Sequence, residues 1–213
     1  QFADVVTVNS GNVGIGVSPS DKLHVGGSAA FIRVDRSDGE AGITLMYNGS
    51  NSTRSNIATQ TNGDLAIDTA NTERMRIDAT GAVTMPTQPA FLVRPSVGQT
   101  NLPNGVTTVI FGTEIFDQNS DFASNTFTAP VAGKYHLDAN LWLEQVDTAI
   151  NYLYLRLLTS NRNYNDIISP RFSSDPTYWN FQCSVLADMD AGDTASVLYS
   201  QSGTSAQVDI GDK

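Results

Sequence analysis

Residues 133–143 read GKYHLDANLWL, and this stretch decides the fold of the second half of the chain. The odd-numbered positions from 135 to 143 are apolar, and the even-numbered positions from 134 to 140 are polar. Trp142 is the one apolar residue on the even side. Alternation with a period of two is typical of a strand that buries one face. The stretch therefore predicts a long strand whose odd-numbered side chains face a core.

Three further stretches alternate in the same way. Apolar residues recur at every second position in residues 153–157, 179–185 and 195–199. Turn-forming residues separate these stretches, and no segment has the period of an amphipathic helix. The pattern predicts an antiparallel β-sandwich or jelly roll. Cys183 falls among the inward positions of its strand, so we expect an inert core thiol.

The aromatic residues divide the chain into two parts. Residues 1–88 contain three Phe, Tyr or Trp residues, and residues 89–213 contain the other fifteen. Large aromatic side chains supply much of the buried area of a compact core. The stretch TMPTQP at residues 84–89 ends the first part with two prolines. We therefore expect two domains, 1–88 and 89–213, of which only the second can build a core from one chain.

The first part contains a repeat. Residues 11–25, GNVGIGVSPSDKLHV, align without gaps on residues 63–77, GDLAIDTANTERMRI, and a shorter third copy, GAVTM, starts at Gly81. Each copy begins with a glycine turn signal and continues with alternating apolar residues. Each copy therefore predicts a turn that leads into a very short strand.

Short strands of this kind leave an apolar face and unpaired edges exposed in a single chain. Three identical chains wound around one axis would bury the apolar positions between them. We therefore expect residues 1–88 to form a trimeric β-rich shaft. The alternative is a loose linker whose internal similarity arises by chance.

Composition excludes several classes of function. The formal net charge is −10, which disfavours binding to nucleic acids and to anionic membranes. No apolar run approaches the roughly 18 residues that cross a bilayer, so membrane insertion is not expected. A single cysteine and two distant histidines leave no ligand set for a zinc or iron–sulfur site. Because the sequence starts at Gln1 without a leader, we expect a fragment or a processed chain.

The second part resembles the globular C1q domain of the C1q and tumour-necrosis-factor superfamily. The resemblance covers roughly residues 89–210. It rests on the stretch FTAPVAGKY at residues 127–135, on Phe116-Asp117, on ADMDAGDT at 187–194, and on Ala90-Phe91. It implies a ten-strand jelly roll that forms compact trimers, with calcium bound at the apex in some members. The family ends with a Phe-Ser-Gly-Phe-like strand that is not found before Lys213. That strand lies beyond this sequence or another segment replaces it.

The first part resembles the Gly-Asn-Val-Gly-Ile-Gly repeats of bacteriophage tail fibres and similar virion appendages. The residues that carry this likeness are 11–19 and 74–85. The same repeat occurs in some bacterial surface proteins. In tail fibres it implies trimeric β-rich shafts, so a shaft followed by a trimeric head is the layout of an attachment fibre.

Catalytic chemistry finds little support in the sequence. No Gly-x-Ser-x-Gly elbow occurs, and the glycines at 11, 14 and 16 lack the spacing of a dinucleotide loop. The acidic residues at 188, 190 and 193 fail the calcium-loop pattern, so no metal or other cofactor is expected. Asp117 with Asp121, and Asp166 with Asp175, qualify as glycosidase pairs by residue type alone.

We therefore predict a non-enzymatic structural and receptor-binding component of a phage tail fibre or related virion fibre. Its expected partners are two further copies of itself, other virion proteins and a host surface glycan or protein. Tyr164, Asp166 and Tyr178 lie in or near expected loops and are the candidate receptor-binding residues. Trp179 is expected to be buried. The alternatives are a bacterial surface adhesin of the same layout and a polysaccharide-degrading tailspike.

Overall fold

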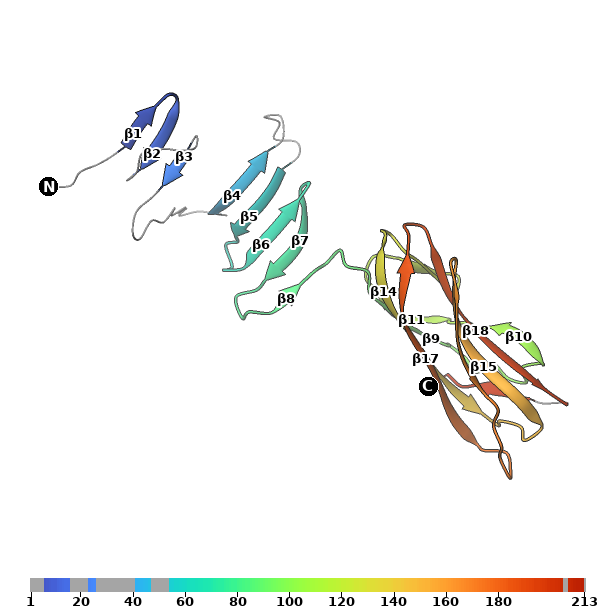
Figure 1. The fold of residues 1–213 in the computed structure, drawn as a ribbon. Coiled ribbons are helices and arrows are strands. Elements are labelled where there is room, and N and C mark those ends of the chain that lie inside the picture. The colour runs from blue at the N-terminus through green and yellow to red at the C-terminus, as the bar shows by residue number, and fades with distance from the viewer. Residues whose placement is uncertain (1–5, 16–22, 26–40, 47–53, 205–206, 213) are drawn as a thin grey trace. The chain divides into compact units, whose positions relative to one another are not determined.

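The computed structural model describes residues 6–15, 23–25, 41–46, 54–204 and 207–212. Every helix or strand within these ranges is a β-strand, so the all-β prediction is confirmed (Figure 1). The chain divides into two compact units, unit 1 at residues 1–86 and unit 2 at residues 87–213. The division falls inside the proline-containing stretch at 84–89.

Unit 1 contains two sheets. The first consists of β1 (Val6–Asn9), β2 (Asn12–Ile15) and β3 (Leu23–Val25). The second is a meander of five antiparallel strands: β4 (Ala41–Met46), β5 (Arg54–Thr59), β6 (Leu65–Thr69), β7 (Thr72–Ile77) and β8 (Val83–Thr84).

The three repeat copies share one local structure. Gly11, Gly63 and Gly81 have φ angles of 79°, 88° and 93°, a conformation that a Cβ atom disfavours. Each glycine precedes a strand, namely β2, β6 and β8, so the predicted turn and strand of each copy are confirmed. The copies differ in strand pairing. β2 pairs with β3 in parallel, whereas β6 pairs with β7 antiparallel through a two-residue turn.

One ion-pair network ties the turn before β6 to β7. Arg76 Nη1 lies 2.6 Å from Asp64 Oδ2, and the same guanidinium also bonds the Glu73 carboxylate. Asp64 Oδ1 accepts a hydrogen bond from the Ala79 backbone N–H at 3.0 Å. The Arg76 side chain holds the pKa of both carboxyls, Asp64 and Glu73, below their ordinary values.

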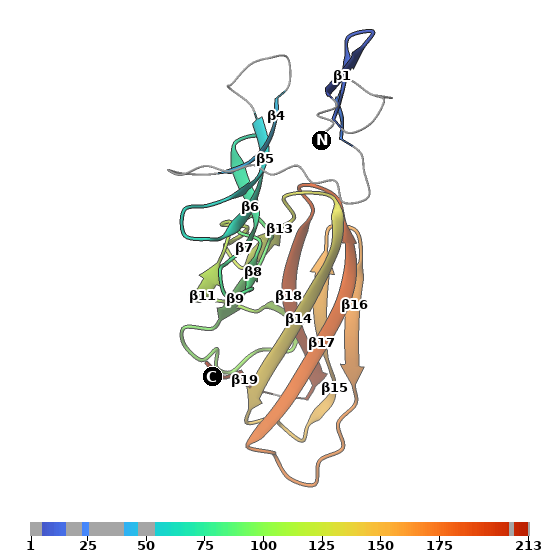
Figure 2. The same ribbon diagram turned by 90° about the vertical axis from the view of Figure 1, so that its left-hand side faces the viewer.

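Unit 2 is an antiparallel β-sandwich (Figure 2). One sheet has the order β12 (Phe122–Ala123), β13 (Thr126–Thr128), β18 (Thr194–Gly203), β15 (Ile150–Thr159) and β16 (Asn163–Ile168), and β10 (Gly105–Thr108) also pairs with β18. The other has the order β17 (Tyr178–Met189), β14 (Gly133–Glu144) and β19 (Asp209–Ile210). A separate pair consists of β9 (Phe91–Arg94) and β11 (Thr113–Asp117).

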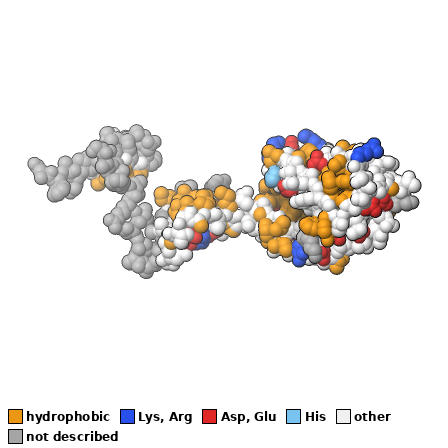
Figure 3. Space-filling model, turned by 90° about the horizontal axis from the view of Figure 1, so that it is seen from below, with side chains coloured by type: hydrophobic (Ala, Val, Ile, Leu, Met, Phe, Trp, Pro, Cys, Tyr) orange, Lys and Arg blue, Asp and Glu red, His pale blue; other side chains and the backbone are white. Residues whose placement is uncertain are grey.

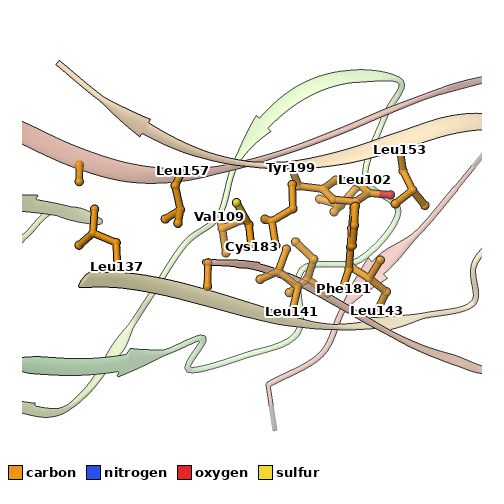
Figure 4. Close-up of a cluster of buried hydrophobic side chains, with 14 of the residues drawn as sticks. Leu102, Val109, Leu137, Leu141, Leu143, Leu153, Leu157, Phe181, Cys183 and Tyr199 are labelled. Carbon is orange, nitrogen blue, oxygen red and sulfur yellow. The ribbon is translucent and has the colours of Figure 1, made fainter. Parts of the chain in front are cut away.

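The core lies between the two sheets (Figure 4). β14 and β17 pair over their whole lengths, from Gly133 opposite Met189 to Glu144 opposite Tyr178. The odd-numbered residues of β14 from 137 to 143 are buried, and the even-numbered residues from 134 to 142 are exposed. Leu153, Leu155 and Leu157 are buried from the opposite sheet. The alternation predicted for these strands is confirmed.

A short last strand is present. Ile210 of β19 pairs with Leu143 of β14 on one side and with Gln99 on the other. The two-residue strand β19 meets β14 only at Leu143 and Glu144. Of the alternatives left open by the sequence, the structure therefore supports replacement of the last strand by another segment, over two residues only.

Candidate binding surfaces

An exposed aromatic pair lies on the outer face of the β14–β17 sheet. The ring centroids of Trp142 and Tyr178 are 5.2 Å apart, and the rings are tilted by 59°. Trp142 is 42% exposed and Tyr178 is 59% exposed. Both residues occupy even positions in their strands, which point away from the core. Two large rings therefore stand together in solvent on a rigid sheet.

Amide side chains surround this pair. Asn180 lies opposite Trp142 in the strand register, and Gln182 lies opposite Asn140 on the same exposed face. The Gln182 Nε2 lies 3.3 Å from Asp138 Oδ2. Aromatic faces pack on apolar ligand surfaces, while amides donate and accept hydrogen bonds. This combination suits a ligand that has both hydroxyl groups and C–H faces, as a saccharide does.

The structure separates the three residues that the sequence singled out. Tyr178 belongs to the aromatic pair. Tyr164 and Asp166 lie on β16, in the other sheet of the sandwich. Asp166 is exposed and pairs with Leu155 in the register.

The prediction that Tyr164 lies in a loop is wrong. Tyr164 is half-buried in β16, opposite Leu157, and packs against the core. Its carbonyl oxygen lies 3.7 Å from the Cys183 Sγ, which donates to it. A polar stretch, Asn163 to Asp166, conceals this strand in the sequence, because β15 supplies the pairing and the core supplies the burial.

Sequence reasoning missed Trp142 as a binding residue, although a signal was available. Trp142 was the one apolar side chain on the polar side of its strand. An exposed large aromatic residue on an otherwise polar face marks a recognition surface more often than a packing position. Its partner Tyr178 has the same parity across the ladder, opposite Glu144.

A second exposed aromatic group lies on the outer face of the other sheet. Tyr152 and Tyr154 stack with ring centroids 6.5 Å apart, and the Arg156 guanidinium lies 4.9 Å from the Tyr154 centroid. Arg156 Nε also donates to Asn165 Oδ1 at 2.6 Å. These contacts occupy the faces of the rings with neighbouring side chains, so this group offers less open ring surface than the Trp142–Tyr178 pair.

The carboxylates proposed as glycosidase pairs hold loops in place. Asp117 accepts hydrogen bonds from the backbone N–H groups of Asp121 and Phe122, at 3.1 and 2.9 Å. Asp175 accepts one from the Thr148 N–H at 2.8 Å. Lys134 Nζ lies 2.6 Å from Asp188 Oδ1. Across the described part of the chain, no group of three or more His, Cys, Asp or Glu residues is placed to hold a metal ion.

The remaining reactive side chains are placed as expected. Cys183 is buried, and burial raises the pKa of its thiol above the ordinary value. His136 is exposed, with Nε2 3.1 Å from Ser184 Oγ. Within the described ranges, no helix is long and apolar enough to cross a membrane.

Comparisons with known proteins add one likeness. No protein-family model matches the sequence, and no curated protein matches it. Among solved structures, the globular domain of the zebrafish complement 1qA protein is similar to this chain, with 21% sequence identity and a TM-score of 0.37. The match covers 58% of this chain and 95% of that chain.

Proposed function

We propose that this chain is a structural and receptor-binding component of a trimeric phage tail fibre or related virion fibre. In this proposal unit 1 is a shaft that three chains build together, and unit 2 is a head that contacts a receptor on the host surface. The observation that carries the proposal is an uncovered apolar face on the five-stranded sheet of unit 1.

This apolar face runs across the strands in two rows. In the strand register, Ile43 lies opposite Ile57, Ile57 opposite Ile67, and Ile67 opposite Met75. The second row consists of Leu65, Ile77 and Val83. Directly opposed residues share one face of a sheet. The hydrophobic side chains gather on one side of the described part of unit 1 (Figure 3).

The apolar rows are open to solvent in the single chain. Ile43, Ile57 and Val83 are 57%, 51% and 53% exposed. A sheet with one apolar face is stable only when another layer covers that face. Identical copies of the chain can supply this layer, because the same rows are present on each copy. Three copies around a common axis would bury all of the rows and give a shaft its stiffness.

The aromatic pair supports a binding role for unit 2. Trp142 and Tyr178 are displayed on a rigid sheet, and amide side chains lie beside them. The carboxylates Asp117 and Asp175 serve as hydrogen-bond acceptors for loop backbone. We therefore assign binding rather than glycan cleavage to unit 2, with a host surface saccharide as the ligand.

Assembly tests the shaft. Mass photometry of the intact chain should give particles of about three chains, and Ile57→Asp should dissociate them because it places a charge in the apolar row. Thr84→Asp is the matched control. It adds the same charge at an exposed position of β8, on the face that carries Arg76. A wild-type chain that stays monomeric at micromolar concentration would contradict the shaft.

Location tests the fibre. Gold-labelled antibody against unit 2, viewed on negatively stained virions of the source phage, should decorate the fibres. Label on the bacterial surface in place of the virion would favour an adhesin and contradict the proposal.

A further inference from the structure

The sheet that contains β14 is incomplete along one edge. β17 covers the first edge of β14 throughout. Along the second edge, β19 pairs only with Leu143 and Glu144, and the Gly211 N–H donates to the Trp142 carbonyl at 2.8 Å. From residue 141 back to residue 134, no strand in the described part of the chain pairs with this edge.

The backbone groups on this open edge can be assigned. N–H and C=O groups of successive strand residues point to alternate sides. Because the Trp142 carbonyl faces β19, the backbone groups of Asn140, Asp138 and His136 face the same side. They form the row of donors and acceptors that an added strand would satisfy.

A groove lies along the same edge. Its volume is about 710 Å³, and its lining includes residues 134–141 of β14 on one side and residues 91–93 of β9 on the other. Phe127, Leu157 and Val197 add apolar surface to the lining. An apolar groove with a row of unpaired backbone groups suits a polypeptide strand better than a small apolar ligand, which would leave those groups unsatisfied.

β19 shows how a strand fits at the end of this groove. Ile210 exchanges backbone hydrogen bonds with Gln99, of 2.8 and 2.9 Å, and pairs with Leu143 on its other side. Beyond Gly211, the Asp212 carbonyl accepts a hydrogen bond from Arg94 Nη1 at 2.8 Å. Arg94 is the last residue of β9. β19 therefore sits between β14 and the segment that follows β9, in line with the groove.

We propose that the groove binds a β-strand from a partner polypeptide, which adds antiparallel to β14 between β14 and β9. Addition of an extended peptide to an open sheet edge is an established mode of recognition. The register of β19 sets the alternation. Partner residues opposite Leu141, Ala139 and Leu137 point inward and should be aliphatic, and the residues between them should be polar. About six residues, spanning roughly 20 Å, fill this edge.

A peptide titration tests the proposal on the intact chain. The probe is an eight-residue peptide that alternates Val with Thr and Lys, and the control peptide has the same composition with its Val residues adjacent. Calorimetry should show binding of the alternating peptide that is about tenfold tighter than that of the control. Hydrogen exchange should slow at the amides of His136, Asp138 and Asn140, which face the groove. Equal binding of both peptides, or unchanged exchange at these amides, would overturn the proposal.

Two variants at one position separate groove binding from other contacts. Asp138→Pro removes an N–H that faces the groove and leaves the β14–β17 ladder intact, because that N–H does not point to β17. Asp138→Ala keeps the N–H. The Pro variant should bind the alternating peptide about tenfold more weakly, and the Ala variant should bind it as the wild type does. If the Pro variant fails to fold, the amide exchange of the wild type decides.

Self-association is the competing occupant, and it can be told from the proposed shaft. The test is mass photometry of Ile57→Asp, alone and combined with Asp138→Pro. A monomeric Ile57→Asp chain that still binds the peptide supports the partner strand. An oligomer that survives Ile57→Asp and is lost with Asp138→Pro would assign the groove to a second copy of the chain and overturn the partner strand. Failure of the shaft leaves the groove unaffected, because the groove lies wholly within unit 2.

Discussion

The indole ring of Trp142 lies against the backbone of Gly211. A Cβ atom at residue 211 would come within 2.8 Å of Trp142 Cδ1 and within 2.9 Å of Glu144 Oε1. Those distances are too short for non-bonded carbon and oxygen atoms, so a residue without a side chain is required where the ring passes. The segment that follows β19 thus sets the position of an exposed aromatic residue on β14.

Gly211→Ala should move the Trp142 ring. We expect a changed near-ultraviolet circular dichroism signal and a loss of about 1 kcal/mol of unfolding free energy, the low end for overpacking, because the ring is partly exposed and can rotate. Gly133→Ala is the control, because its Cβ would meet only Tyr135 Cε2 at 3.7 Å. An unchanged signal in Gly211→Ala would show that the ring does not depend on this contact.

Trp142→Ala and Tyr178→Ala should each weaken binding to host cells or their purified surface glycan by about 1–2 kcal/mol, as loss of a useful aromatic contact does. Melting temperatures should change little, because both side chains are exposed. Tyr152→Ala is the control, since it removes an exposed aromatic residue from the opposite sheet. Equal binding by all three variants would remove the aromatic pair from the receptor site. Release of reducing sugar ends by the wild type would contradict a non-enzymatic role.

The Arg76 network should make unit 1 sensitive to acid. Arg76 lowers the pKa of Asp64 and of Glu73 in the folded chain, from ordinary values of 3.8 and 4.5. A lowered folded-state pKa stabilises the fold above the ordinary pKa, and this stabilisation is lost as the pH falls through and below that value. The stability difference between wild type and Arg76→Gln should therefore be full near pH 7 and shrink below about pH 4.5. Thermal unfolding of both chains from pH 7 to pH 3 measures it, and a difference that grows in acid would contradict the assignment.

Tyr199→Phe should destabilise unit 2 by about 1 kcal/mol, the usual net value of a buried hydrogen bond. The Tyr199 hydroxyl donates to Gln201 Oε1 at 3.0 Å, and Gln201 Nε2 donates to the Leu102 carbonyl at 2.6 Å. Burial also raises the pKa of Tyr199, so it should not ionise with the exposed tyrosines. Denaturant unfolding and an absorbance titration check both points. Tyr152→Phe, at an exposed position, should leave stability unchanged but remove a tyrosinate signal.

The strands that bury one face could be read from the sequence, because burial imposes the period of two on their side chains. β14 and β17 show this, with Leu137 and Phe181 buried as their parity predicts. β5 and β16 could not be read in this way. Ser55 and Asn56 in β5, like Asn163 in β16, are polar, and these segments become strands because neighbouring strands pair with them. Tertiary pairing of this kind leaves no local signature.

The candidate surface was only half predictable. Tyr178 was recognised from its residue type, but its partner Trp142 lies 36 positions earlier in the sequence and reaches it through the β14–β17 register. The strand groove was not predictable at all, because it depends on how little of β14 is covered by β19. Both features follow from long-range pairing, which a single sequence does not encode at fixed spacing.

Cys183 gives this protein a built-in reporter of its own kinetics. It is the single cysteine of the chain, and its Sγ lies between the sheets, bonded to the Tyr164 carbonyl. A thiol reagent in solution can reach it only after β16 and β17 part. Its labelling half-life under native conditions therefore times the opening of the sandwich, free of background from unit 1 and without any engineered probe. The lifetime of the head on an intact particle could be followed by the same reaction.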